Sequence, residues 1–138
     1  MPIIYQAEDI DRPKIRQRET SNWIKDVARI HRKKIGEIAF IFCSDKKILE
    51  INRQYLQHDY YTDIITFDYS EKNIISGDIF ISVDTVKSNS EKFNTHYNDE
   101  LYRVIIHGIL HLCGLNDKSP EEENGMREKE NEALTLIL

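Results

Sequence analysis

The sequence has few cysteines and no long apolar run, and both absences narrow the class of protein. Its 138 residues include two cysteines, Cys43 and Cys113, which lie far apart and outside any C-x-x-C pair. A disulfide scaffold and a thiolate zinc cluster are therefore excluded. No apolar run approaches the roughly 20 residues of a membrane span, and the first residues carry no secretory pattern. We expect a cytoplasmic protein without membrane association.

Proline and glycine are also scarce, with three and five residues scattered along the chain. Their distribution indicates no linker between domains, and the chain contains no low-complexity stretch or internal repeat. A length of 138 residues is what one domain usually occupies, and it is sufficient to bury a core without disulfides. We therefore expect a single domain over residues 1–138.

Positive charge is in the minority, yet it is concentrated in one segment. The net charge of −5 argues against broad, charge-driven coating of nucleic acid. Residues 12–34 nevertheless contain nine basic side chains against two acidic ones. Two interpretations stay open for this segment: a solvated helix face, or a basic surface for a polyanion such as an RNA backbone.

Hydropathy patterns predict four strands and five helices in the order β-α-β-α-β-β-α-α-α. The expected strands cover residues 3–5, 37–43, 63–69 and 74–83, and the expected helices cover 14–34, 45–56, 84–93, 99–113 and 120–136. Gly36 is expected to end the first helix. This order predicts an α+β fold in which a small mixed sheet of about four strands carries helices packed largely on one face.

The segment from His107 to Asp117 has the spacing of a metal site. His107 and His111 lie one helical turn apart, so both imidazoles project from the same side of a helix. Gly114 can end that helix in a left-handed conformation, and Asp117 then follows as a third ligand. The bare histidine pair is also compatible with two core histidines satisfied by hydrogen bonds, but the glycine and the aspartate at this spacing favour a three-ligand metal site. Zinc suits these ligands, as do Fe(II) and Mn(II).

The surrounding sequence resembles the signature of the YbeY family of bacterial metal-dependent endoribonucleases. The resembling segments, 52–55, 59–67, 77–82 and 107–114, keep the order that they have in the family. The resemblance implies a zincin-like α+β fold and one bound zinc ion. It also implies a cytoplasmic, single-strand-specific endoribonuclease that acts in ribosome quality control and in maturation of the 3′ end of 16S ribosomal RNA. The expected partner is the ribosome, through its small subunit, and no dinucleotide cofactor is expected.

Three residues depart from the family pattern. Asp117 stands where the family usually has a third histidine, Leu56 where it has an arginine, and Tyr61 where it has a proline. An aspartate still binds a metal and adds negative charge to the site. Leucine, in contrast, cannot replace a guanidinium in bidentate phosphate recognition.

These observations give a set of expected site residues and three possible functions. We expect His107, His111 and Asp117 to be the metal ligands, with both histidines serving catalysis and Arg53 as the matched candidate for a phosphate clamp. The first alternative to an endoribonuclease is a non-catalytic, metal-containing ribosome-assembly or RNA-binding factor. The second is a metallopeptidase, which Gly108 argues against because metzincin proteases carry their general-base glutamate at that position.

Overall fold

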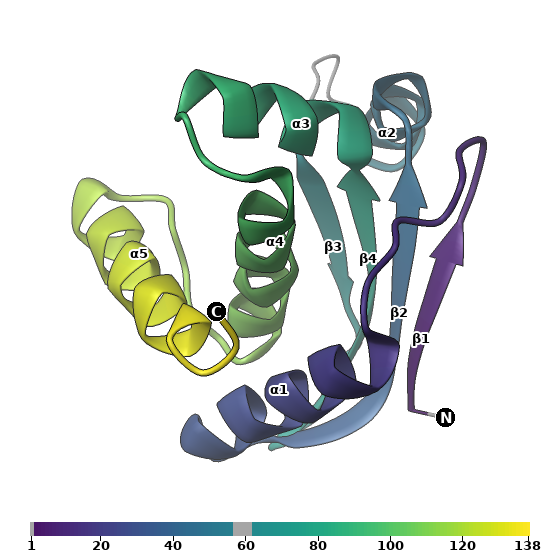
Figure 1. Cartoon of the computed structure of the whole chain (residues 1–138). Helices are drawn as coiled ribbons and strands as arrows, with labels where there is room; N and C mark the ends of the chain where they lie inside the picture. The colour runs from purple at the N-terminus through teal and green to yellow at the C-terminus, as the bar shows by residue number, and fades with distance from the viewer. Residues whose placement is uncertain (1, 57–61) are drawn as a thin grey trace.

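The computed structural model describes residues 2–56 and 62–138, and its central element is a four-stranded mixed sheet (Figure 1). The strands are β1 (Ile3–Ala7), β2 (Lys34–Cys43), β3 (Ile64–Asp68) and β4 (Ile74–Ser82), in the spatial order β1-β2-β4-β3. β1 and β4 run parallel to β2, whereas β3 runs antiparallel to β4. The helices are α1 (Gln17–Ile30), α2 (Asp45–Ile51), its π-helical continuation η1 (Asn52–Leu56), α3 (Val83–Lys92), α4 (Tyr97–Leu112) and α5 (Pro120–Leu134). The predicted element order and the α+β class are confirmed.

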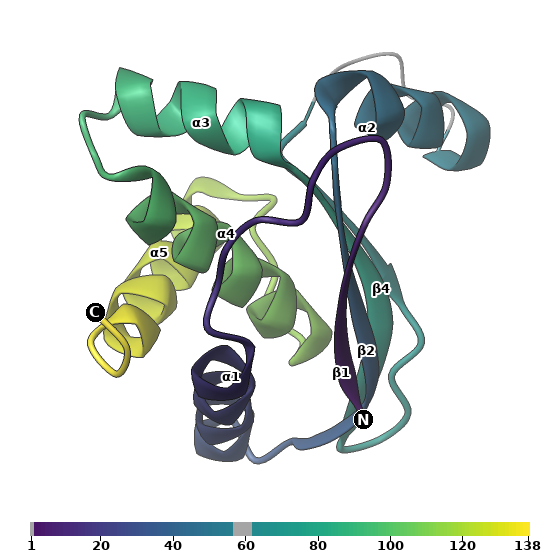
Figure 2. The same ribbon diagram turned by 45° about the vertical axis from the view of Figure 1, so that its right-hand side comes forward.

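The two faces of the sheet are covered unequally. On one face Ile38, Phe40 and Ile79 are buried in the main core together with apolar residues of α1 and α4. Figures 1 and 2 show α1, α3, α4 and α5 on this side. At one end of the opposite face α2 packs Ile48 into a smaller cluster with Ile65. The expectation that the helices lie largely on one face is therefore confirmed.

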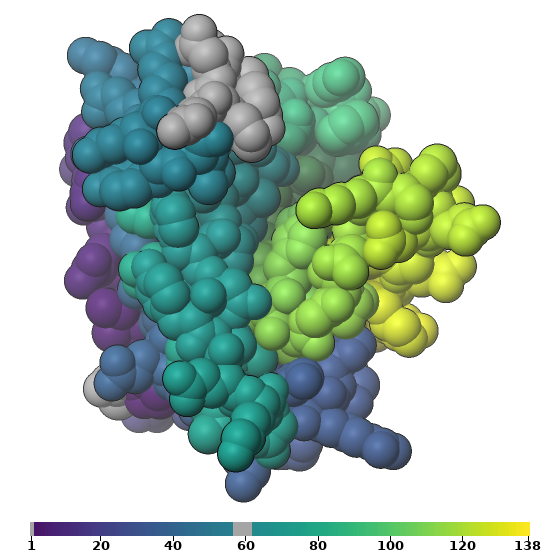
Figure 3. Space-filling view, turned by 180° about the vertical axis from the view of Figure 1, so that it is seen from behind, coloured from purple at the N-terminus to yellow at the C-terminus, as the bar shows by residue number. Residues whose placement is uncertain are grey.

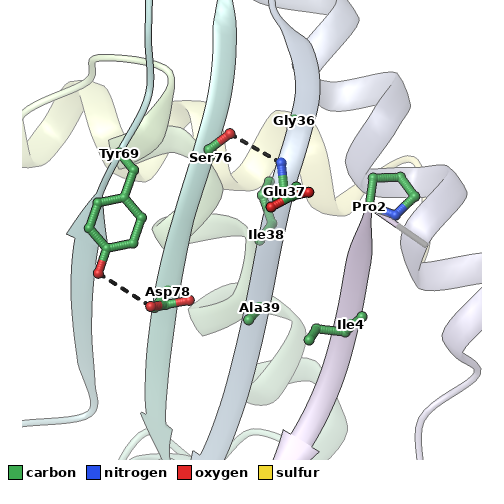
Figure 4. A pocket seen from close by; sticks show the side chains of 9 residues that line it. All are labelled: Pro2, Ile4, Gly36, Glu37, Ile38, Ala39, Tyr69, Ser76 and Asp78. Atoms are coloured by element: carbon green, nitrogen blue, oxygen red, sulfur yellow. Dashed lines mark hydrogen bonds between the residues drawn. The ribbon is translucent and has the colours of Figure 1, made fainter.

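The remainder of that opposite face forms a hollow of about 540 Å³ (Figure 4). Tyr69 donates a hydrogen bond to Asp78 here, and the backbone N–H of Glu37 donates to the hydroxyl of Ser76. The helices of the main core lie behind the sheet in this view. This hollow is therefore separated by the sheet from α4 and its two histidines.

α1 is shorter than the sequence predicts, because the chain leaves the helix before Gly36. The expected helix covered residues 14–34, whereas α1 ends at Ile30 and Gly36 lies inside β2. The backbone N–H of Lys33 donates to the carbonyl of Ala28 at 2.8 Å, which is a bond of the Schellman pattern. Arg32 occupies the left-handed position of this turn, with φ of 60°. The prediction that Gly36 ends the helix is therefore wrong.

Serine side chains define the starts of three helices. Ser44, Ser82 and Ser119 each accept a hydrogen bond from the backbone N–H three residues later, at the beginnings of α2, α3 and α5. Such bonds satisfy N–H groups that have no partner within the helix. At α5 the side chain of Glu122 also accepts from the backbone N–H of Ser119, which completes a capping box. None of the helices in the described ranges is both long enough and apolar enough to cross a membrane.

Candidate metal centre

α4 presents two histidines on one side and an apolar surface on the other. The imidazole centroids of His107 and His111 are 4.6 Å apart, as expected for side chains one helical turn apart. Gly108, between them along the chain, faces the sheet. A Cβ atom at this position would come within 3.0 Å of the Ile64 side chain. The missing side chain therefore allows α4 to lie close to β3 and β4.

Gly114 ends α4 and turns the chain back toward the histidines. Its φ of 101° lies in the region that L residues rarely adopt. The backbone N–H of Leu115 donates to the carbonyl of Leu110 at 3.1 Å, which gives α4 a Schellman end. The turn brings the Leu115 carbonyl to 3.0 Å from Nδ1 of His111. The predicted left-handed turn at Gly114 is confirmed.

Asp117, beyond this turn, lies against both imidazoles. Its Oδ2 atom is 3.3 Å from Nε2 of His107 and 3.4 Å from Nε2 of His111. Ligand atoms of the three residues all lie within 4.8 Å of one another. In a tetrahedral zinc site with bonds of about 2.0–2.1 Å, neighbouring ligand atoms are about 3.3–3.4 Å apart. The structure thus brings the three expected ligands together, and both nitrogen–oxygen separations are typical of one coordination sphere.

Hydrogen bonds on the far side of each ring determine which nitrogens face Asp117. Nδ1 of His111 lies beside the Leu115 carbonyl, which can only accept, and Nδ1 of His107 lies 2.7 Å from Oε2 of Glu130. From these partners we assign the hydrogen of each neutral ring to Nδ1, so both Nε2 lone pairs face the Asp117 carboxylate. Three electron-pair donors without a hydrogen between them repel one another unless a cation separates them. The donor set therefore fits a divalent metal ion.

Glu130 on α5 is a buried carboxylate that sequence reasoning missed. Its side chain is 6% exposed, and its second oxygen accepts a hydrogen bond of 2.8 Å from Arg103. Burial alone would raise the pKa of Glu130, but hydrogen bonds from His107 and Arg103 outweigh it and lower that pKa. Burial likewise works against protonation of His107, but the bond to Glu130 and the nearby carboxylates raise the pKa of His107 above its ordinary value. The available signal was spacing, because Glu130 lies on the buried side of α5 with Met126 and Ala133.

A hollow of about 290 Å³ opens beside His107. Asp63, His107, Asp117 and Arg127 are among the residues that line it. Burial raises the pKa of the Asp63 carboxyl, with His107 acting in the opposite direction. Arg127 also lines an adjoining hollow of about 380 Å³ that contains His107 and Asp117. Its side chain is 61% exposed, and the sequence did not single it out.

Comparisons with known proteins identify the family. The family described as Endoribonuclease YbeY matches residues 5–137 of this chain. The chain belongs to the YbeY family. An endoribonuclease YbeY of Bacteroides fragilis is 66% identical over 136 residues, covering 99% of this chain and 98% of the relative. One of Parabacteroides distasonis is 64% identical over 137 residues, covering 99% and 96%.

A solved structure supports the same fold. The solution structure of a Thermotoga maritima protein matches this chain with a TM-score of 0.67 and 27% sequence identity. The match covers 96% of this chain and 86% of that protein. The mixed sheet and its helices are therefore an arrangement already observed in solution.

Arg53 and Leu56 do not line either hollow beside His107. Arg53 is exposed on η1 and is not among the residues that line either hollow beside His107. Leu56, where the family usually has an arginine, is the last residue of η1 and is 40% exposed. Tyr61, where the family usually has a proline, lies outside the described residues. The role of Arg53 as a phosphate clamp therefore stays a prediction.

Proposed function

We propose that this chain is a cytoplasmic, metal-dependent endoribonuclease that cleaves single-stranded ribosomal RNA, with the small ribosomal subunit as its partner. One zinc ion is held by His107, His111 and Asp117. The observation that carries this proposal is the convergence of both Nε2 atoms on Oδ2 of Asp117 in a member of the YbeY family. When bound, the metal would supply Lewis-acid activation at the phosphodiester bond.

Three residues around the metal-binding group would orient a ligand, contact the substrate phosphate and accept a proton. Glu130 holds His107 with Nε2 directed toward Asp117, so the ligand is oriented before a metal arrives. Arg127, exposed at the rim of the hollow, would contact the phosphate of the substrate. Asp63 is the candidate proton acceptor, because burial raises its pKa and makes its carboxylate a stronger base.

Asp117 would modify the chemistry relative to the three-histidine site usual in the family. The carboxylate would add a negative charge, so a bound metal would be a weaker Lewis acid and would acidify water less than a metal held by three histidines. We therefore expect cleavage to be faster at alkaline pH. The variant Asp117→His should move the pH–rate profile toward neutral pH while retaining one metal per chain.

The test combines metal content with RNA cleavage. The protein is purified without added metal, its metals are measured by elemental analysis, and it is incubated with single-stranded ribosomal RNA. We expect about one zinc per chain and chelator-sensitive cleavage. Asp117→Ala should lose the metal, whereas Asp63→Asn should retain it and cleave about 100-fold or more slowly. Cleavage by metal-free protein at the full rate would contradict the proposal.

A second candidate function is a non-catalytic RNA-binding factor in ribosome assembly. The observation in its favour is Leu56, which cannot clasp a phosphate as the arginine usual in the family would. This factor would bind metal and ribosomal RNA without cutting it. Intact RNA after incubation with fully metal-loaded protein would favour this second function. Chelator-sensitive digestion of casein would instead support a metallopeptidase.

A further inference from the structure

The C-terminal end of α1 gathers basic side chains around one hollow. The structure divides the basic segment 12–34, because α1 begins only at Gln17 and Lys34 already belongs to β2. A hollow of about 330 Å³ at this end is lined by Pro2, Lys25, Arg29, Lys33, Lys34 and Ile35. Four of these six side chains are cationic, and none is acidic.

We propose that this hollow, named here the α1 basic hollow, binds phosphate groups of an RNA backbone. It would be a second contact for the RNA on which the metal centre acts, and it therefore rests on the proposed function. The four cations that define it are Lys25, Arg29, Lys33 and Lys34.

Charge compensation within the α1 basic hollow is weak. In the hollow Arg29 has a partner in Asp26, at 3.3 Å, but both side chains are mostly exposed, so the pair is weakly held. Within the described ranges the three lysines of the hollow form no ion pair. Their mutual repulsion is thus relieved only by solvent, salt or a bound anion.

The backbone brings these side chains together at a conformational cost. The Schellman turn reverses the chain at Arg32, so Lys33 and Lys34 return toward the last turns of α1. Arg32 adopts φ of 60°, a conformation that glycine or asparagine usually supplies at such a position. Strain that is retained in a native structure supports a functional hypothesis when it positions a group of side chains. Here the strained turn at Arg32 places Lys33 and Lys34 in the α1 basic hollow.

The proposal requires one RNA strand to reach both the α1 basic hollow and the metal centre. Figure 3 shows the end of α1 (blue) on the same face as the segment that follows α4 (lime) and contains Asp117. Lys33 also acts electrostatically on Cys113, the residue that caps α4. Binding is expected to be sequence-independent, because phosphate contacts position a strand without reading its bases.

The test measures the salt dependence of binding to a single-stranded oligoribonucleotide that carries 2′-O-methyl groups to prevent cleavage. For single strands the slope of log K against log salt changes by about 0.7 for each lost phosphate contact. The double variant Lys33→Gln/Lys34→Gln should therefore flatten the slope by about 1.4 and weaken binding roughly 25-fold at about 0.1 M salt. Lys25→Gln/Arg29→Gln tests the same hollow from α1 and should act in the same direction.

The matched control is Lys46→Gln/Lys87→Gln, which removes the same charge from exposed positions on α2 and α3. If the control flattens the slope as much as the variants of the hollow, the proposal is overturned in favour of a solvated face. It is also overturned if the hollow variants lose binding to anionic phospholipid vesicles but retain wild-type RNA binding.

Failure of this inference is distinguishable from failure of the proposed function. The hollow variants should cleave an RNA too short to span both sites at the wild-type rate, and a long RNA more slowly. Unchanged salt slopes in an active nuclease would refute only the α1 basic hollow. A slope change in a protein that never cleaves RNA would support the hollow and refute the nuclease.

Discussion

The C-terminal ends of α1 and α4 share a hydrogen-bond pattern but differ in the residue that makes the left-handed turn. Both are Schellman ends, with Arg32 at φ of 60° after α1 and Gly114 at φ of 101° after α4. At α4 the turn presents nitrogen and oxygen ligands that fit a cation. At α1 the turn gathers cations that fit an anion. The same backbone motif thus serves two opposite electrostatic purposes, at a strain cost in the turn at Arg32.

The largest expected effect is at the α4 side of this comparison. His107→Ala removes one of the three converging ligands, so we expect complete loss of metal retention and of RNA cleavage together. His96→Ala, on an exposed histidine of the same chain, is the matched control and should change neither. Elemental analysis and a cleavage assay check both variants. Full nuclease activity in His107→Ala would contradict the metal mechanism.

The next effect tests how the first histidine is oriented. Glu130→Gln removes the carboxylate that accepts from Nδ1 of His107, and loss of such an orienting partner typically weakens metal binding by about 10- to 100-fold. Competition with a chelator at alkaline pH measures this change. Glu128→Gln, on an exposed position of α5, is the control. Equal affinity in both variants would show that His107 needs no carboxylate.

Gly114→Ala tests the turn itself. A Cβ atom here would meet no neighbour within 4 Å, so the cost lies in the backbone, at about 1–2 kcal/mol. We expect a lower Tm and weaker zinc binding, because Leu115 and Asp117 move with the turn. Gly125→Ala is the control, since a Cβ atom there also meets no neighbour and Gly125 lies within α5. An unchanged Tm in Gly114→Ala would mean that the turn tolerates an L residue.

A smaller effect appears in the pH dependence of stability. The folded-state pKa of His107 is raised above 6.5, so in the metal-free protein its contribution to the free energy of unfolding is complete below that pH. This contribution is lost as the pH rises through the folded-state pKa. Metal binding needs the neutral ring, so the increase in Tm on adding zinc should grow over the same interval. Thermal unfolding with and without zinc between about pH 5.5 and about pH 8.5 measures it. A constant increase would contradict the raised pKa.

The smallest effect is expected at the α1 end. Arg32→Gly should relieve the left-handed strain and stabilise the protein by about 0.5–1 kcal/mol, after allowance for the greater backbone entropy of glycine. Lys25→Gly, at an exposed position in the interior of α1, is the opposite control and should destabilise by a similar amount. Urea unfolding compares the two. A destabilised Arg32→Gly would show that the arginine side chain stabilises this turn.

The same comparison explains what the sequence could predict. Gly114 predicted the end of α4 correctly because glycine favours the left-handed turn. Arg32 has no such preference, so the sequence predicted that α1 ends at Gly36 instead. Periodicity placed His107 and His111 on one side of a helix, and spacing added Asp117. Spacing with Met126 and Ala133 indicates that Glu130 lies on the buried side of α5, but it does not predict the contact with His107, which joins residues 23 apart on two helices. Periodicity predicts that α5 is helical, but not which of its carboxylates docks against α4.

The docking of α5 has a consequence for the order in which the protein matures. The contacts that hold this helix include a hydrogen bond from Trp23 to the carbonyl of Ala133, at 2.8 Å, and the pair between Glu130 and His107. During synthesis α4 emerges before α5, so the histidines exist before the carboxylate that orients one of them. The site is therefore completed only after α5 has packed. A nascent chain in which α5 has not yet packed thus lacks the carboxylate that orients His107 toward Asp117.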